Sequence, residues 1–214
     1  TIEAWINPAN VSQNARIVAR GNTGTPGSYQ LNINTNGRLR ISFYENELNS
    51  SNDVIDANTW QHLVLTRNGT TVKGYVNAEE VISFSNSSNL TSSQALVIGY
   101  EPGPSSYFNG LIDEVTVWNR ALTQEEIQAS MTKAWVPEEG TGIVGYWRME
   151  KGAGNTAIDL SGNGNHGTIS GAAWSDDAVS FIPAVTLGAA AGAYTNVSPI
   201  PVTADFTMNV TGFN

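Results

Sequence analysis

Residues 110–127 read GLIDEVTVWNRALTQEEI, and this segment contains one strand and one helix start that together point to the fold class. Its first nine residues have the β-branched and aromatic character of a buried strand, yet Asp113 and Glu114 place two adjacent carboxylates within it. Successive side chains of a strand point to opposite faces, so one acid falls in an apolar row whichever face is buried. A buried carboxylate without a partner is costly, and we favour Arg120, Arg148 or backbone N–H donors over a metal as that partner.

A short helix is predicted directly after this strand, within ALTQEEIQASM at residues 121–131. Thr123 can accept a hydrogen bond from a backbone N–H of the first turn. Glu126, three residues later, can accept one from the backbone of Thr123, which is the capping-box pattern. It is the one helix that the sequence predicts.

The segments before the strand alternate apolar and polar side chains over short lengths, as strands do. Asn36-Gly37 separates two such runs and Asn68-Gly69 separates two others, and an Asn-Gly pair suits a two-residue hairpin turn with positive φ. Adjacent antiparallel strands at this spacing predict an all-β fold, an antiparallel two-sheet jelly-roll sandwich with one short helix. The expected strands lie in TIEAWINP, ARIVARG, SYQLNINTNGRLRISFYE, WQHLVLTRNGTTVKGYVNAEEVISF, QALVIGY and GLIDEVTVW.

The composition excludes several kinds of protein. The 214 residues carry a formal net charge of −9 and show no basic patch, which argues against nucleic acid or an anionic membrane surface as a partner. The chain has no cysteine, so disulfides and Cys-ligated zinc are excluded. No apolar run approaches the length needed to span a bilayer, and we expect no membrane insertion.

Several motifs together resemble the laminin-G-like, concanavalin-A-like jelly-roll family of bacterial surface proteins. They are TIEAWINP, TWQHLVLTRNGTTVKGYVN, FNGLIDEVTVWNRALTQEEI and GYWRMEKGAGNTAIDLSGNGNHGTISGAAW. The resemblance covers about residues 1–181 and implies one domain, to which GYWRMEKG returns as a final strand. The family begins with an earlier strand around an FDG-x-x-DYV motif that this chain lacks, so we expect Thr1 to be a cut inside the domain.

Residues 182–214 have a different composition, and we expect a linker followed by the start of an Ig-like module. This tail is similar to repeats of giant bacterial adhesins, including those used in surface gliding. The resemblance as a whole implies a non-catalytic extracellular adhesion module on the bacterial cell surface, joined to neighbouring domains of the same long chain. Its expected ligand is a glycan or another cell-surface ligand. Two alternatives stay open, an accessory or catalytic domain of a carbohydrate-active enzyme and a structural spacer without a ligand.

The acidic residues lack the spacing expected of a glycosidase, so we predict that the chain is not an enzyme. Such enzymes need two carboxylates that face each other across a cleft. Asp113 and Glu114 are adjacent and point to opposite faces of their strand. Glu45 and Glu47 have a suitable spacing, but they lie where a strand runs out into a polar loop.

The loop GYEPGPSSYFNG holds the candidate glycan-binding residues. Tyr100 and Tyr107 can stack on sugar rings, while Glu101 and Asn109 can bind hydroxyl groups. Binding residues are often carried on loops at one end of a rigid scaffold. The alternative is that the two tyrosines simply pack on neighbouring strands.

The loop DLSGNGNHG is the candidate metal site. Calcium takes about six to eight oxygen ligands, and Asp159 and Asn163 offer such oxygens on a glycine-rich loop. The resemblance implies that structural calcium is common near such loops. Asp113 could join the same ion if its strand runs beside the loop. The alternative is a hydrogen-bonded turn in which Asp159 accepts from the amides that follow it.

Overall fold

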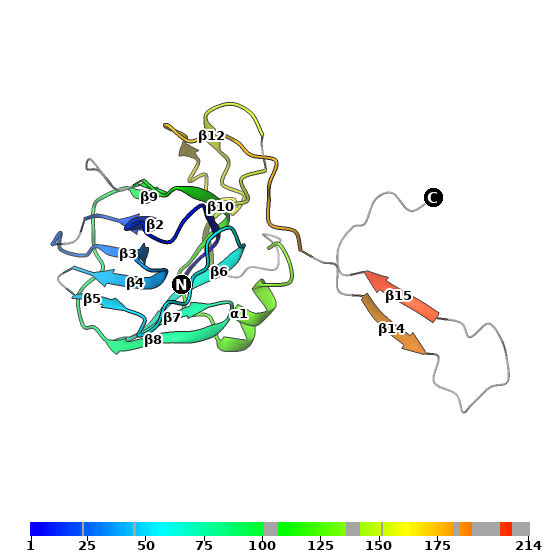
Figure 1. Cartoon of the computed structure of the whole chain (residues 1–214), viewed down its shortest axis with the longest axis horizontal. Coiled ribbons are helices and arrows are strands. Elements are labelled where there is room, and N and C mark those ends of the chain that lie inside the picture. The colour runs from blue at the N-terminus through cyan, green and yellow to red at the C-terminus, as the bar shows by residue number, and fades with distance from the viewer. Residues whose placement is uncertain are drawn as a thin grey trace.

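The computed structural model of the chain describes residues 1–22, 24–44, 46–100, 107–135, 142–150, 152–181, 185–189 and 202–206. Two antiparallel sheets form its main body (Figure 1). The larger sheet consists, in spatial order, of β11 (Ile143–Trp147), β10 (Gly110–Trp118), β1 (Ile2–Pro8), β6 (Gln61–Asn68), β7 (Thr71–Val76) and β8 (Glu79–Ser85). The smaller consists of β5 (Asn46–Asn49), β4 (Arg38–Phe43), β3 (Tyr29–Asn34), β2 (Ala15–Arg20) and β9 (Leu96–Ile98). The expected all-β jelly-roll sandwich is confirmed.

The inner faces of the two sheets enclose the main apolar core. The alternation predicted from the sequence supplies it, because every second residue of β3 and β4 turns inward. Leu31, Ile33, Leu39 and Ile41 are fully buried in this way. The polar residues between them therefore lie on the outward face of the five-stranded sheet.

Helix α1 (Gln124–Ser130) covers part of the outward face of the six-stranded sheet and closes a second apolar cluster there (Figure 1). The capping box is confirmed, since the Thr123 hydroxyl accepts from the Glu126 N–H and the Glu126 side chain accepts from the Thr123 N–H. Ile127 of the helix and Trp118 of β10 are both buried in this cluster. The six-stranded sheet is thus covered on both faces.

The segment after the helix returns to the same sandwich, as expected from the sequence. Strand β11 pairs antiparallel with β10, with Val115 opposite Trp147 and Val117 opposite Gly145. Two short strands follow, β12 (Thr156–Ala157) and β13 (Gly167–Thr168), which pair with each other. Further along, β14 (Val185–Ala189) and β15 (Val202–Phe206) form an antiparallel pair. The Ig-like module expected in this region stays a prediction.

The two Asn-Gly hairpins differ. Asn36 and Gly37 both have positive φ, as predicted, but the connection has three residues because Asn34 pairs with Arg38. At the second site the prediction of the turn was wrong by one residue. Asn68 is the last residue of β6 and pairs with Thr71, so Gly69 and Thr70 make the turn.

Within the ranges that the structure describes, no helix has the length and apolar character required to cross a bilayer.

Candidate functional site

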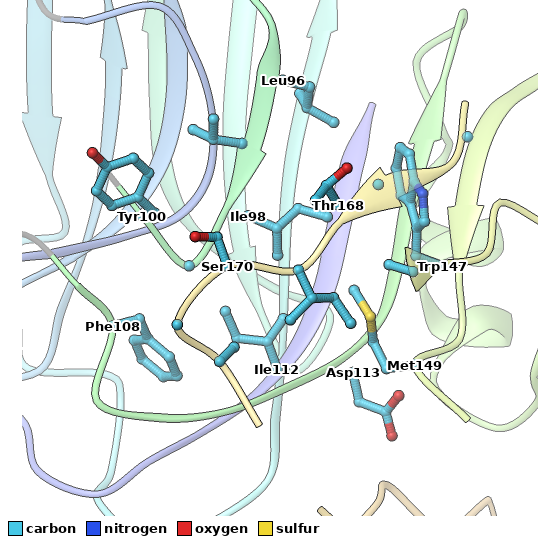
Figure 2. Close-up of a pocket in the computed structure, with 18 of the residues that line it drawn as sticks. Leu96, Ile98, Tyr100, Phe108, Ile112, Asp113, Trp147, Met149, Thr168 and Ser170 are labelled. Atoms are coloured by element: carbon cyan, nitrogen blue, oxygen red, sulfur yellow. The ribbon is translucent and has the colours of Figure 1, made fainter. Parts of the chain in front are cut away.

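A cleft of about 1070 Å³ opens between the neighbouring edges of the two sheets, at β9 and at β10–β11 (Figure 2). Its apolar wall comes from β9 on one side and from β10 and β11 on the other, and the chain around β13 crosses in front of it. Leu96 and Ile98 of β9, which pair with Arg20 and Val18 of β2, pack against the apolar core. The described residues of the wall include Leu96, Ile98, Phe108, Ile112, Trp147, Met149 and Ile169.

A glycine shapes this wall. A Cβ atom at Gly145 of β11 would lie 2.4 Å from Cη2 of Trp147, closer than non-bonded atoms approach. The absence of a side chain therefore lets the indole lie across β11 and form one side of the cleft. The Trp147 Nε1–H donates to the Asn165 carbonyl at 3.0 Å, which fixes the ring in this orientation.

Two of the predicted glycan-binding residues meet at this cleft. The rings of Tyr100 and Tyr107 stack with their centroids 5.0 Å apart and their planes 27° apart. Both residues line the cleft, and Tyr107 is 64% exposed. Most of the Tyr107 side chain is thus exposed although its ring stacks on Tyr100, and the role of the two tyrosines in binding a glycan stays a prediction.

The other two predicted residues do not complete this arrangement. Asn109 is exposed, but it does not line the cleft. Its backbone is tied to Gln13, whose Oε1 accepts from the Asn109 N–H at 2.8 Å and whose Nε2 donates to the Asn109 carbonyl at 3.1 Å. Glu101 lies outside the described residues.

Sequence reasoning missed several polar and aromatic residues of the cleft. Arg20, Gln94 and Trp174 line it, as do His166 and Asp177. Trp174 lies in a segment of glycine, alanine and serine without periodicity, so no pattern placed it at the cleft. An isolated tryptophan in such a segment was the available signal, because a large apolar ring in a loop usually needs a neighbour to pack on.

The two adjacent acids of β10 are both buried, and a β-bulge is the reason. Glu3 pairs with Thr116 and Trp5 with Asp113, so β10 has one residue more than β1 between these pairs. Glu114 is this extra residue, and its φ of 49° is the backbone conformation that accommodates the bulge. Asp113 is 5% exposed and Glu114 7%, so neither acid is presented to solvent.

Both acids have partners, as predicted. The Asp113 carboxylate accepts from the backbone N–H of Glu114 at 2.9 Å and of Val179 at 3.0 Å. Glu114 accepts from the Tyr146 hydroxyl and from Nε of Arg148, the latter at 3.2 Å. Of the two candidate arginines, Arg148 is therefore the partner. Arg120 lies 2.8 Å from Glu126 of helix α1 instead.

Burial is the largest influence on the pKa values of Asp113 and Glu114. It raises the pKa of Glu114 to about 7, against the opposing effects of the Tyr146 hydroxyl and the Arg148 guanidinium. Burial also raises the pKa of Asp113, while the backbone N–H groups of Val179 and Glu114 oppose this. Asp113 lines the cleft and Glu114 does not. The pair ties β10 to β11 and to the chain near residue 179.

The oxygens of Asp159 are fully used by hydrogen bonds within the protein. Oδ1 accepts from the N–H groups of Tyr146 and Ser161, each at 2.9 Å. Oδ2 accepts from the Ser161 hydroxyl at 2.9 Å and from the Asn165 N–H at 2.8 Å. This is the turn that the sequence left open as the alternative, and its donors lower the pKa of Asp159 although burial opposes them.

The other two predicted metal ligands do not assemble around Asp159. The Asn163 side-chain amide donates to the carbonyls of Ile143 and Val144, each at 3.2 Å, and Asp113 is bound to backbone N–H groups elsewhere. In the described part of the chain, no group of three or more His, Cys, Asp or Glu side chains could hold a metal. The structure thus places Asp159 and Asn163 in a hydrogen-bonded turn and Asp113 on backbone N–H groups, and calcium binding by the protein stays a prediction.

Comparison with known sequences identifies the domain. The model of a family described as the Concanavalin A-like lectin/glucanases superfamily (Laminin_G_3) matches residues 1–128. No curated protein sequence matches the chain.

Comparison with solved structures shows the same fold in two bacterial proteins. A candidate carbohydrate-binding protein from Bacteroides ovatus is 20% identical with a TM-score of 0.65, and the match covers 78% of this chain and 53% of that one. The CBM40 of a Ruminococcus gnavus IT-sialidase, bound to α2,3-sialyllactose, is 15% identical with a TM-score of 0.52, and the match covers 60% of this chain and 80% of that one. The chain thus spans about half the length of the Bacteroides ovatus protein.

Proposed function

Because the chain belongs to the Concanavalin A-like lectin/glucanases superfamily, we propose that it is a non-catalytic module that binds glycans at the mouth of the cleft, the part beside Tyr100 and Tyr107. The structural similarity to a carbohydrate-binding module and to a candidate carbohydrate-binding protein supports this class of ligand. Neutral sugars also suit a chain whose net charge of −9 disfavours polyanions such as nucleic acid.

The stacked pair of Tyr100 and Tyr107 carries the proposal. Aromatic rings offer a flat apolar face together with a polar hydroxyl, a combination that suits the alternating CH and OH surfaces of a sugar ring. Tyr107 is 64% exposed although it belongs to the wall of a large cleft. The side chains of Arg20, Gln94 and Trp174, which line the same cleft, supply hydrogen-bond donors and a third aromatic surface.

The carboxylates of the cleft support the non-catalytic assignment. A glycosidase needs two carboxylates, one free to donate a proton and one free to attack or activate water. Among the described residues, Asp113 and Asp177 line the cleft. Asp113 accepts backbone hydrogen bonds at both oxygens, so it is held in a structural role. The competing hypothesis is a glycan-cleaving domain, and it predicts that a bound oligosaccharide is cleaved into shorter products.

We further propose that the module acts outside the cell, as the adhesive part of a large bacterial surface protein. The resemblance of the chain to surface-protein jelly rolls, together with a tail similar to Ig-like adhesin repeats, supports this setting. Labelling of intact cells with an antibody against residues 1–181 tests it. Labelling only after lysis would contradict it.

Binding at the cleft mouth predicts that Tyr107→Ala weakens glycan binding about tenfold or more, because the exposed ring supplies the stacking surface. A glycan array identifies the ligand, and titration calorimetry then gives the affinities of the parent and the variant. Leu48→Ala is the matched control, since Leu48 is also a partly exposed apolar residue but lies on β5, at the opposite edge of the sheet from β9. Parallel titrations with calcium and with a chelator test the calcium prediction.

Three outcomes would count against the proposal. Absence of binding to every glycan of a broad array would favour a structural spacer without a ligand. Glycan binding that Tyr107→Ala leaves unchanged would show that the binding site lies away from the cleft mouth. Cleavage of the bound oligosaccharide, seen by mass spectrometry after long incubation, would establish the enzyme instead.

A further inference from the structure

The apolar wall of the cleft is continuous with the main core of the sandwich. Several large apolar side chains pack against the buried core residues on one side and line the cleft on the other, and each of them is only partly buried. They are Leu96, Ile98, Phe108, Ile112, Val117 and Met149. At this cleft the apolar core is therefore open to a ligand.

The lengths of the strands leave this opening. Strand β9 has three residues and ends the five-stranded sheet, and β11 ends the six-stranded sheet. Strand β11 pairs with β10 from Val115 to Trp118, so the stretch of β10 around Ile112 is paired with β1 alone among the described strands. The side chains at these edges thus lack the neighbours that cover their counterparts in the middle of each sheet.

The chain that crosses in front of the cleft covers this wall from outside. Ile169 of this chain also packs against the main core as a partly buried side chain. Its N–H donates to the Asn155 carbonyl at 2.8 Å, and the Trp174 indole N–H donates to the Gly154 carbonyl at 2.7 Å. Both bonds hold the crossing chain to the segment before β12, on the far side of the cleft from β9. The space between this chain and the apolar wall belongs to the cleft.

The exposed side chains of the cleft are mostly polar. Gln94, Thr168, Ser170 and Asp177 line it and are exposed, as is Tyr107 at its mouth. The larger apolar side chains are instead partly buried. The cleft thus combines an apolar interior with a polar border, and a ligand that fills it needs both kinds of surface.

The cleft is also larger and longer than a single sugar ring requires. Its volume of about 1070 Å³ reaches the upper end of the range of small-molecule pockets, roughly 300–1,000 Å³. Figure 2 shows the apolar side chains in a row, from Tyr100 and Phe108 at one end past Ile98 and Ile112 to Trp147 at the other. This shape suits an extended chain.

Sugar hydroxyls and alkyl groups would behave differently against this wall. A hydroxyl group that leaves water for a carbon surface loses hydrogen bonds that the surface cannot replace. A methylene group gains from the same transfer, because its apolar surface is removed from water. The wall therefore favours an alkyl group over a second sugar.

We propose that the cleft binds an amphiphilic glycan, with the sugar at the mouth beside Tyr107 and an alkyl or acyl chain of the aglycone along the apolar wall. The sugar part of this inference rests on the proposed function, whereas the chain part rests on the wall itself. A glycolipid and a free fatty alcohol can both supply such a chain, but only the glycolipid also supplies the sugar.

A series of alkyl glycosides tests the chain. Titration calorimetry measures binding of methyl, butyl and octyl β-glucoside, each below its micelle-forming concentration, and of 1-octanol. Each buried methylene strengthens binding by up to about fourfold, so we expect octyl glucoside to bind at least about tenfold more tightly than butyl glucoside. We expect 1-octanol, which lacks the sugar, to bind at least about threefold more weakly than octyl glucoside.

Methionine methyl signals place the chain in the cleft. Met149 lines the cleft, whereas Met131 packs in the apolar cluster beneath helix α1 and is an internal control. With ¹³C-methyl-labelled methionine, octyl glucoside is expected to shift the Met149 signal and to leave the Met131 signal in place. Methyl glucoside is expected to shift neither.

Two variants remove apolar surface from opposite sides of the cleft. Ile98→Ser acts on β9, and Ile169→Ser acts on the crossing chain, which lies outside both sheets, so a failure of the first to fold leaves the second informative. Each is expected to weaken octyl glucoside binding about tenfold and to change methyl glucoside binding less than about twofold. Leu48→Ser is the matched control, because Leu48 is 39% exposed and lies on β5. Circular dichroism and melting temperature confirm folding.

The outcomes separate this inference from the proposed function. Equal binding of octyl and methyl glucoside, or a Met149 signal that octyl glucoside leaves in place, would overturn the alkyl site, while Tyr107-dependent binding of array glycans would still support the cleft mouth. A dependence on chain length that Ile98→Ser or Ile169→Ser removes and Tyr107→Ala leaves intact would support the alkyl site even if the proposed function failed. Binding of 1-octanol as tight as that of octyl glucoside would overturn the assignment to an amphiphilic glycan.

Discussion

Glu114 shows how a single residue can be both strained and charged within a strand. Its positive φ places one extra residue in β10, and its carboxylate is then enclosed with Tyr146 and Arg148. The need for a partner could be predicted from the sequence, because an acid in an apolar row is costly. The identity of that partner could not be derived, since nothing in IDEVTVW marks the bulge beside which both acids are buried.

Replacing Glu114 by Gln should change the pH dependence of stability. The pKa of Glu114 is about 7 in the folded protein and near 4.5 when unfolded, so the folded state binds more protons between these values. Its contribution to stability is present below pH 4.5 and is lost as the pH rises through 7. Glu114→Gln cannot ionise, and its stability relative to the parent should rise by roughly 2–3 kcal/mol between pH 5 and pH 8.

Urea denaturation at pH 5, 6, 7 and 8 measures this difference. Glu150→Gln is the control, because Glu150 also pairs with Arg148 but is largely exposed, and its difference from the parent should stay flat. A Glu114→Gln difference that is equally flat would show that the carboxyl titrates at its ordinary pKa.

At the scale of the element, turns mark the limit of what the sequence predicts. Asn36 and Gly37 have the positive φ that their residue types suggest. The turn between β7 and β8 uses Asn77 and Ala78, both also at positive φ. It could not be predicted, because alanine is not typical of that conformation. Tertiary contacts decide it, since Ala78 is buried in the cluster beneath helix α1.

Gly37→Ala should destabilise the protein more than Gly69→Ala. Both glycines have positive φ, so each substitution carries the cost of that backbone conformation, about 1 kcal/mol. A Cβ at Gly37 would also lie 2.2 Å from the Ile55 carbonyl oxygen, whereas nothing lies within 4 Å of one at Gly69. We expect Gly37→Ala to cost at least ~1 kcal/mol more, measured by urea denaturation. Equal losses would show that the loop at Ile55 moves away freely.

At the scale of the whole molecule, the sandwich extends beyond the segment that the family model matches. The model ends at residue 128, but β11 begins at Ile143 and contributes Tyr146, which is fully buried. This return was expected because GYWRMEKG resembles the final strand of the family's jelly roll. The sequence did not predict the cleft, because the cleft depends on where the edges of the two sheets meet in space.

A chain that ends at residue 135 should therefore be much less stable than one that ends at residue 181. The shorter chain loses the pairing of β11 with β10, the fully buried Tyr146 and the contacts of Tyr146 and Arg148 with Glu114. We expect its melting temperature to fall by at least ~10 °C. The chain of residues 1–181 should melt with the full chain. Equal melting of all three would show that the matched segment folds by itself.

The position of β10 has a consequence for how the domain would bear a pulling force. The first residue of the chain is bonded at one end of β10, where the Thr1 amino group donates to the Trp118 carbonyl at 3.3 Å, and the chain near Val179 is bonded to Asp113, nearer the other end. Tension between these two attachment points runs lengthwise along β10. Its ladders to β1 and β11 would then have to slide rather than open one rung at a time, which is the geometry in which hydrogen-bonded strands resist pulling best.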